Sequence, residues 1–238
     1  MASDQTISRA NVERDVVITI DNISLNGTLA LPRHASGIVL FAHGSGSSRL
    51  SPRNRQVAHV LQSHGIATLL FDLLTPEEEA VDQYTSEHRF DINLLGERLV
   101  GATRWVMSQP GLNRLNLGYF GASTGAAAAL FAAAKLPNEI SAVVCRGGRP
   151  DLAEHALGSV RAPTLLIVGG DDGQVIRMNQ DAMAQMRHAE TQLFIIPGAT
   201  HLFEEPGKLE KVAHHAAEWF SRYLGSTETH VVKTPAVR

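Results

Sequence analysis

Short apolar runs alternate along the chain with longer stretches in which apolar residues recur every three or four positions. Short runs rich in Val, Ile and Leu are typical of buried strands, and the longer period is typical of amphipathic helices. Their alternation predicts an α/β fold, in which helices cover both faces of a mostly parallel sheet. The eight predicted strands lie at residues 16–20, 27–31, 38–42, 67–71, 115–120, 140–145, 164–168 and 192–196.

The order of these segments also predicts how they pair and where helices begin. A short polar stretch separates the first two strands, so we expect an antiparallel pair there and six parallel strands after it. Helices are predicted to begin at Pro52 and Pro76, because Ser51 and Thr75 are good caps before a first-turn proline. Further helical patterns cover residues 88–108, 124–135, 175–188 and 206–223.

Composition and charge narrow the class of protein. Apolar residues make up 44% and charged residues 19% of the 238 positions, which is an ordinary globular balance. We find no linker, and we expect one domain over residues 1–225 with a flexible tail at 226–238. The 21 basic residues against 24 acidic ones offer no broad basic surface for nucleic acid. Without a signal-peptide pattern or an apolar run of about 18 residues, we expect a cytoplasmic monomer or homodimer with no membrane partner.

The strongest chemical signal is the sequence Gly-Ala-Ser-Thr-Gly at 121–125, which stands between a predicted strand and an alanine-rich helical pattern. In a G-x-S-x-G elbow the turn exposes the serine hydroxyl, and larger residues at the two glycine positions would collide with the neighbouring strand and helix. The helix N-terminus also offers the backbone amide of Thr124 to a developing negative charge. We therefore predict Ser123 as a nucleophile, although a plain turn before a helix would look similar.

A serine nucleophile needs a histidine base and an acid that orients the base. Gly-Gly-Asp-Asp at 169–172 follows the seventh predicted strand, and His201 follows the eighth. Either loop alone could be an ordinary turn, with a helix cap or a solvated histidine. The chain order Ser, Asp, His on three strand ends favours an α/β-hydrolase triad, with the aspartate at 171 or 172.

A second glycine-rich segment, His-Gly-Ser-Gly at 43–46, follows the third predicted strand. Backbone amides in such a loop can point at an anion, and we expect the amide of Ser45 to complete an oxyanion hole with that of Thr124. A flexible connection is the alternative, while the dinucleotide pattern G-x-G-x-x-G fails because Arg49 stands at its sixth position. We expect no cofactor and no metal, since even His214 and His215 are adjacent on a helix and point in different directions.

Four arginines are expected at or near the carboxyl edge of the sheet: Arg49, Arg53, Arg146 and Arg149. We predict Arg49 and Arg146 as ligands of a substrate carboxylate. Ion pairs with local acids, such as Asp72 and Asp151, are the alternative for these arginines. The single cysteine, Cys145, stands at a strand end and is expected to be a small buried apolar side chain.

These segments together resemble the dienelactone hydrolase-like branch of the α/β-hydrolase superfamily, over nearly the full length. The matching segments include HGSGSSRLSPRN at 43–54, ATLLFDLLTPEEE at 67–79, GASTGAAAAL at 121–130, RGGRPDLA at 146–153, GGDDGQV at 169–175 and GATHLF at 198–203. The resemblance implies a compact enzyme without a large lid, and its G-x-x-D-x-x-V pattern favours Asp172 as the acid. Dienelactone hydrolases proper, and some relatives with promiscuous phosphotriesterase activity, carry cysteine where this chain has Ser123, so dienelactone does not follow as the substrate.

The residues predict a serine hydrolase that cleaves small carboxylic esters through an acyl-enzyme. A second hypothesis keeps the site but assigns it to lactone or phosphotriester hydrolysis. A third, from another class, is a non-catalytic ligand-binding or regulatory module that keeps the fold.

Overall fold

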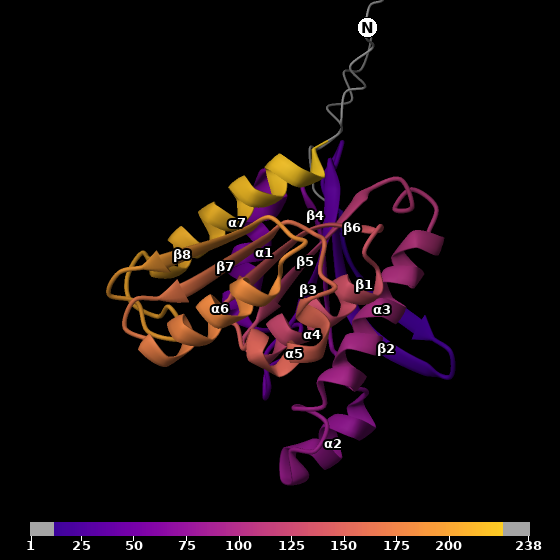
Figure 1. Cartoon of the computed structure of the whole chain (residues 1–238). Coiled ribbons are helices and arrows are strands. Elements are labelled where there is room, and N and C mark those ends of the chain that lie inside the picture. The colour runs from indigo at the N-terminus through magenta and orange to yellow at the C-terminus, as the bar shows by residue number, and fades with distance from the viewer. Residues whose placement is uncertain (1–11, 226–238) are drawn as a thin grey trace, which may run out of the picture.

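The computed structural model describes residues 12–225 and contains an eight-stranded sheet with helices on both faces (Figure 1). Its strand order is β1-β2-β4-β3-β5-β6-β7-β8. The first strand pair and the β2–β4 pair are antiparallel, and the other five pairs are parallel, so the predicted α/β architecture is confirmed. The strands are β1 Val12–Ile20, β2 Ile23–Leu31, β3 Gly37–Ala42, β4 Ala67–Phe71, β5 Asn116–Ala122, β6 Ile140–Arg146, β7 Thr164–Gly169 and β8 Thr191–Ile196. The tail predicted at 226–238 lies outside the described residues.

The hairpin between β1 and β2 is tighter than the sequence suggested. Ile20 pairs with Ile23, which leaves Asp21 and Asn22 as a two-residue turn. Asp21 has a φ of 49°, the left-handed conformation that two-residue hairpins favour and that Asp tolerates. The second strand therefore begins at Ile23 rather than at residue 27.

The helices predicted to begin at Pro52 and Pro76 begin at these residues, after the caps Ser51 and Thr75. The side chain of Thr75 accepts from the Glu78 amide at 3.2 Å, and the Glu78 carboxylate accepts from the Thr75 amide at 2.8 Å. The third helix begins at Ile92 rather than at 88, because Asp91 caps it. The helices are α1 Pro52–Ser63, α2 Pro76–Thr85, α3 Ile92–Ser108, α4 Thr124–Lys135, α5 Glu154–Leu157, α6 Gly173–Gln185 and α7 Lys208–Leu224, with a short 3-10 turn, η1 Pro150–Ala153, before α5. The sequence predicted neither η1 nor α5.

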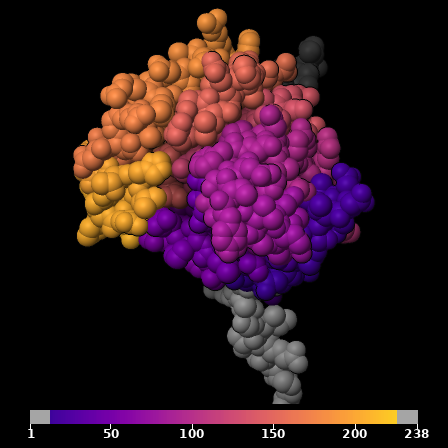
Figure 2. Space-filling view, turned by 90° about the horizontal axis from the view of Figure 1, so that it is seen from below, coloured from indigo at the N-terminus to yellow at the C-terminus, as the bar shows by residue number. Residues whose placement is uncertain are grey.

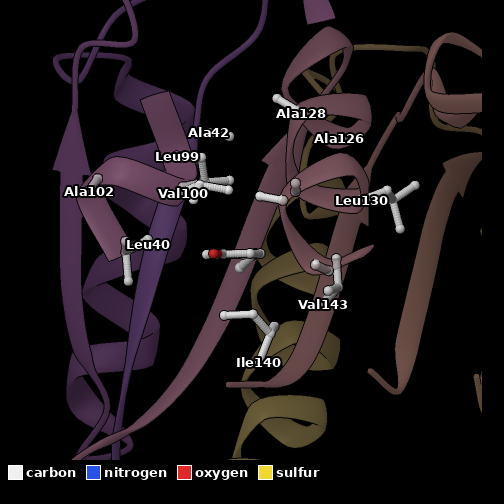
Figure 3. Packing of buried hydrophobic residues seen from close by; sticks show 14 of the residues in the cluster. Leu40, Ala42, Leu99, Val100, Ala102, Ala126, Ala128, Leu130, Ile140 and Val143 are labelled. Carbon is white, nitrogen blue, oxygen red and sulfur yellow. The ribbon is translucent and has the colours of Figure 1, made fainter. Parts of the chain in front are cut away.

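Two apolar layers fix the sheet between its helices. The layer under α3, α4 and α6 is separate from the layer under α1 and α7. Figure 3 shows residues of the first layer, among them Leu99 and Val100 of α3, Leu40 of β3 and Ala126 of α4. All the alanines of α4 except Ala134 are fully buried, and their small size lets this helix lie close to the strands. The ends of the parallel strands are therefore rigid supports for the loops that follow them.

The helix α2 differs from the others, because it projects from the body of the molecule (Figure 1). In Figure 2 the magenta segment that includes α2 and α3 lies between the indigo amino-terminal strands and the orange carboxyl-terminal half.

Within the described part of the chain, none of the helices combines the length and the apolar composition that a bilayer span requires.

Candidate active site

Ser123 occupies a strained turn between β5 and α4. Its φ of 52° and ψ of −121° lie in a region that is costly for any residue with a side chain. Backbone hydrogen bonds hold the turn from both sides: the Ser123 N–H donates to the Arg146 carbonyl at 3.1 Å, and the Ser123 carbonyl accepts from the amides of Ala126 at 3.0 Å and Arg149 at 3.1 Å. The end of β6 and the segment after it therefore hold the Ser123 backbone through hydrogen bonds of Arg146 and Arg149. The sequence did not predict these contacts.

The two glycines of the elbow are required by packing. A Cβ at Gly121 would lie 2.5 Å from the Cα of Ala126. A Cβ at Gly125 would overlap the carbonyl oxygens of Ala42 and His43. These atoms belong to backbone and cannot move aside, so both glycines are explained by the close approach of β3, β5 and α4.

The structure brings His201 between Ser123 and Asp172. The His201 Nε2 is 3.3 Å from the Ser123 Oγ, and the His201 Nδ1 is 2.7 Å from the Asp172 Oδ2. The neighbouring Asp171 is exposed, and its backbone N–H donates to the Ala199 carbonyl at 3.0 Å. Because the His201 Nδ1 faces the Asp172 carboxylate, we place the ring proton on Nδ1, which donates it in a hydrogen bond to Asp172. An imidazole held in this way can accept the hydroxyl proton at Nε2.

Backbone atoms also place the histidine. Gly147 has a φ of 51°, and a Cβ there would lie 3.0 Å from the His201 carbonyl oxygen and 3.4 Å from its ring Cε1. The amide of Thr200 donates to the Glu205 carboxylate at 3.1 Å. The His201 side chain is 37% exposed and that of Asp172 is 17% exposed, so a substrate can reach the imidazole while the acid stays sheltered.

The loop after β3 meets the elbow, but in an arrangement that the sequence did not predict. The Ser45 N–H donates to the side-chain Oγ1 of Thr124 at 2.8 Å. A Cβ at Gly44 would lie 3.1 Å from the Ser123 Cβ, so the loop packs directly on the nucleophile. The Thr124 N–H, at the first residue of α4, has no carbonyl partner within its helix. The two residues predicted to form the oxyanion hole, Ser45 and Thr124, thus lie next to Ser123. The Ser45 amide, however, is already hydrogen-bonded to the Thr124 hydroxyl.

His43 fixes this loop from inside the protein. Its Nδ1 is 3.0 Å from the Gly44 carbonyl oxygen, and its Nε2 accepts from the Leu73 amide at 3.1 Å. Burial lowers the pKa of His43 below its usual 6.5, against the raising effects of the Gly44 carbonyl and of nearby acids. The imidazole is therefore neutral near pH 7 and donates from Nδ1. The sequence analysis did not predict this role of His43, and the only sequence feature that could have indicated it is the position of His43 at the end of a predicted strand.

Two of the arginines form the local ion pairs that were considered as alternatives. The Arg49 guanidinium is 3.7 Å from Asp72, whose carboxylate also accepts from the Arg49 amide at 2.8 Å. Arg149 binds Asp151 through two hydrogen bonds, at 2.9 and 2.8 Å. Arg49 also borders a cavity of about 540 Å³ between the loop after β3 and the segment after β4.

Arg146 is different, because it is buried and pairs with no acid of the described segment. It is 7% exposed, and its Nη2 donates to the Asn54 Oδ1 at 3.2 Å. Among residues 12–225 its Nε atom has no hydrogen-bond partner. Burial first, and then the charge of Arg53, lower the pKa of Arg146 to about 10. Arg53 itself pairs with Glu204 at 2.9 Å.

Two further sequence-based expectations concern Cys145 and metals. Cys145 is fully buried, and burial raises the pKa of its thiol to about 12, so it is the small apolar side chain that we predicted. Within the described ranges, no group of three or more His, Cys, Asp or Glu side chains is arranged to hold a metal ion.

Comparisons with known proteins agree with this architecture. The model of the dienelactone hydrolase family matches residues 25–226. The crystal structure of a dienelactone hydrolase from Anabaena variabilis is 59% identical, with a TM-score of 0.88, over 90% of this chain and 98% of that one. A dienelactone hydrolase-like promiscuous phosphotriesterase from metagenomic libraries shares the fold, with a TM-score of 0.70 and 18% identity over 90% of this chain and 99% of that one.

A curated relative from Mycobacterium tuberculosis has a different name, that of a phosphoribosyl transferase. It is 55% identical over 212 residues, which cover 89% of this chain and 47% of the relative. The chain thus spans about half the length of the curated relatives that it matches.

Proposed function

The chain belongs to the dienelactone hydrolase family, and on that premise we propose that it hydrolyses small carboxylic esters through an acyl-enzyme on Ser123. The observation that carries the proposal is the continuous set of contacts from the Ser123 Oγ to the His201 Nε2 at 3.3 Å and from the His201 Nδ1 to the Asp172 Oδ2 at 2.7 Å. Serine, imidazole and carboxylate in this order supply a nucleophile, a base and an orienting acid.

In the first half-reaction the Ser123 Oγ attacks the ester carbonyl carbon while the His201 Nε2 takes the hydroxyl proton. The C–O bond to the alcohol then breaks, and His201 returns the proton to the departing oxygen. Asp172 keeps the ring oriented and stabilises the imidazolium that forms between these steps. In the second half-reaction His201 deprotonates a water molecule, whose oxygen attacks the acyl carbon. The bond between this carbon and the Ser123 Oγ then breaks, His201 returns the proton to the Oγ, and the carboxylic acid leaves. This reaction calls for no cofactor.

Arg146 and Arg49 are our proposed contacts for an acidic group on the ester. Arg146 is the stronger of the two, because it is buried beside the nucleophile turn without an acid partner among the described residues. A guanidinium in such a position favours an anion that can form two hydrogen bonds to it. Arg49 has Asp72 beside it, so its charge is already balanced.

The test of the proposal is the Ser123→Ala protein. Turnover of p-nitrophenyl acetate should fall by roughly 10⁴-fold or more, and a fluorophosphonate should add its mass to the wild type but not to the variant. Ser108→Ala, which removes a hydroxyl at the end of α3, is the matched control and should keep full turnover. Undiminished hydrolysis by Ser123→Ala would reject the assignment.

The alternatives are separated by a panel of p-nitrophenyl acetate, dihydrocoumarin and paraoxon, run beside Ser123→Ala. The substrate with the largest Ser123-dependent kcat/KM identifies ester, lactone or phosphotriester hydrolysis. If the folded protein formed no fluorophosphonate adduct and turned over nothing, a binding module would be favoured instead. One relative is named a phosphoribosyl transferase, but this chain spans only about half of that relative. We prefer hydrolysis because of the contacts that Ser123 makes with His201.

A further inference from the structure

The side chain of Thr124 lies at the place where the oxyanion hole would be formed. The Ser45 N–H, one of the two amides expected to bind the oxyanion, donates to the Thr124 Oγ1 at 2.8 Å. The other expected donor, the Thr124 N–H, is three bonds away from that oxygen on the same residue. A hydroxyl that accepts one hydrogen bond still has a hydrogen to donate, and within residues 12–225 this hydrogen has no acceptor.

We propose that the Thr124 hydroxyl is itself a catalytic oxyanion donor, which the Ser45 amide holds in place and polarises. The oxyanion of the tetrahedral intermediate would then accept two hydrogen bonds from one residue, from the Thr124 N–H and from the Thr124 Oγ–H. Hydrogen bonds in a chain strengthen one another, so the Ser45 N–H acts through the hydroxyl rather than by direct contact. This inference rests on the proposed ester hydrolysis at Ser123.

The surroundings of the loop argue against the simpler arrangement, in which the Ser45 amide swings away to meet the substrate. Gly44, the preceding residue, accepts at its carbonyl from the Ser47 amide at 3.2 Å and lies 3.0 Å from the His43 Nδ1. His43 is anchored in turn by the Leu73 amide. The peptide that carries the Ser45 N–H is therefore held at its carbonyl end in one orientation.

Rotation of Thr124 away from Ser45 is also unfavourable. Threonine has few χ1 positions because its Cβ is branched, and this residue is only 4% exposed. Rotation would also break the 2.8 Å hydrogen bond that the Ser45 amide donates to the Thr124 Oγ1. Donation by the hydroxyl keeps this hydrogen bond throughout the reaction.

Thr124→Val is the decisive variant, because it keeps the shape and the backbone amide but removes the hydroxyl and frees the Ser45 N–H. We expect kcat for p-nitrophenyl acetate to fall by about 10²-fold, the usual effect of losing one oxyanion donor, with KM changed less than about threefold. Inhibition by a trifluoromethyl ketone, whose adduct with Ser123 carries the oxyanion, should weaken in parallel with kcat/KM. Thr124→Ser restores a donor and should recover most of both losses.

Thr103→Val is the matched control, since Thr103 is a fully buried threonine of α3 that is hydrogen-bonded to Leu99 and Tyr119. It should lower the midpoint of thermal unfolding and leave kcat unchanged. Thermal unfolding of Thr124→Val checks that this variant is folded. If it is not folded, kcat of Thr124→Ala is compared with kcat of Thr124→Ser instead.

Two outcomes overturn the proposal. If Thr124→Val matched or exceeded the wild type, the hydroxyl would be a spectator or an obstruction and the Ser45 amide would bind the oxyanion directly. If Thr124→Ser were as impaired as Thr124→Val, the side chain would have a structural role only. Failure of the ester-hydrolase proposal looks different, because the wild type would then lack any turnover that depends on Ser123.

Discussion

The two sides of the site are held in place by different kinds of contact. On the side of β5 to β8, backbone contacts position the reactive residues: the Ser123 turn is bonded to the carbonyl of Arg146 and the amide of Arg149, and His201 lies against Gly147. On the side of β3 and β4, side chains hold the loops, as His43 does between Gly44 and Leu73. The first side should be sensitive to steric overlap at its glycines and to loss of the His201–Asp172 contact. The second side should be sensitive to changes in the protonation or hydrogen bonding of the side chains that hold its loops.

The segment after α2 shows how far the second kind of contact extends. The Asp82 carboxylate is buried and accepts from the amides of His88 at 2.7 Å and Arg89 at 3.0 Å. The Arg89 Nη2 donates to the Asp82 carbonyl at 2.8 Å. These bonds satisfy the backbone of a short loop that the sequence assigned to the start of α3. The Asp82 carboxylate therefore holds the loop between α2 and α3, while Asp91 caps the start of α3.

The largest expected effect lies within the first side, where Asp172 orients His201. Asp172→Asn should lower kcat for p-nitrophenyl acetate by about 10⁴-fold, which corresponds to about 5.5 kcal/mol of transition-state stabilisation, because an amide cannot hold the imidazole in the correct tautomer. Asp171→Asn is the matched control and should have a mild effect. Steady-state kinetics on both proteins decide the matter, and the reverse ranking would move the role to Asp171.

The next largest effect is steric. Gly121→Ala places a Cβ 2.5 Å from the Cα of Ala126, and neither backbone can retreat from the sheet. We expect the free energy of unfolding to fall by about 3 kcal/mol or more, measured by urea denaturation. Gly158→Ala is the control, because this glycine has a φ of −65° and no atoms within 4 Å of an added Cβ. That variant should be neutral or slightly more stable, and equal losses in the two proteins would refute the packing explanation.

The sequence predicted the backbone-held side of the site well. Gly121, Ser123 and Gly125 form a pattern whose spacing follows from the clash between strand and helix, so their geometry could be inferred before any coordinates. The same holds for the eight strands, because apolar runs reflect burial directly. The choice of Asp172 over Asp171 came from the family resemblance, since both residues follow β7 and adjacent positions in a loop cannot be ordered by pattern alone.

The side-chain-held parts could not be predicted, because they depend on contacts between residues far apart in the chain. Ser45 and Thr124 are separated by 79 positions, and no local pattern shows that the hydroxyl of one meets the amide of the other. Arg49 and Arg146 look alike in the sequence, yet one lies beside Asp72 and the other is buried with Asn54. The sequence shows the charge and the position of each arginine, whereas tertiary packing decides which partner the arginine contacts.

The smallest expected effect tests the side of β3 and β4 through pH. Burial lowers the pKa of His43 below 6.5, so between 6.5 and that lower value the unfolded chain binds a proton at this position and the folded protein does not. The free energy of unfolding should therefore fall as the pH drops below about 6.5, by at most about 1.4 kcal/mol per pH unit from this residue. Above pH 6.5 this contribution is constant.

His43→Asn removes the titrating group while keeping a side-chain donor for the Gly44 carbonyl. Urea denaturation at pH 7.5 and pH 5.5 should show a smaller loss of stability for this variant than for the wild type across the two conditions. His188→Asn, at an exposed position, should keep the wild-type dependence on pH. If His43→Asn lost as much stability as the wild type on acidification, the loop after β3 would not depend on a neutral imidazole. The contrast between the two sides of the site would then be one of geometry alone, since both would withstand acid equally.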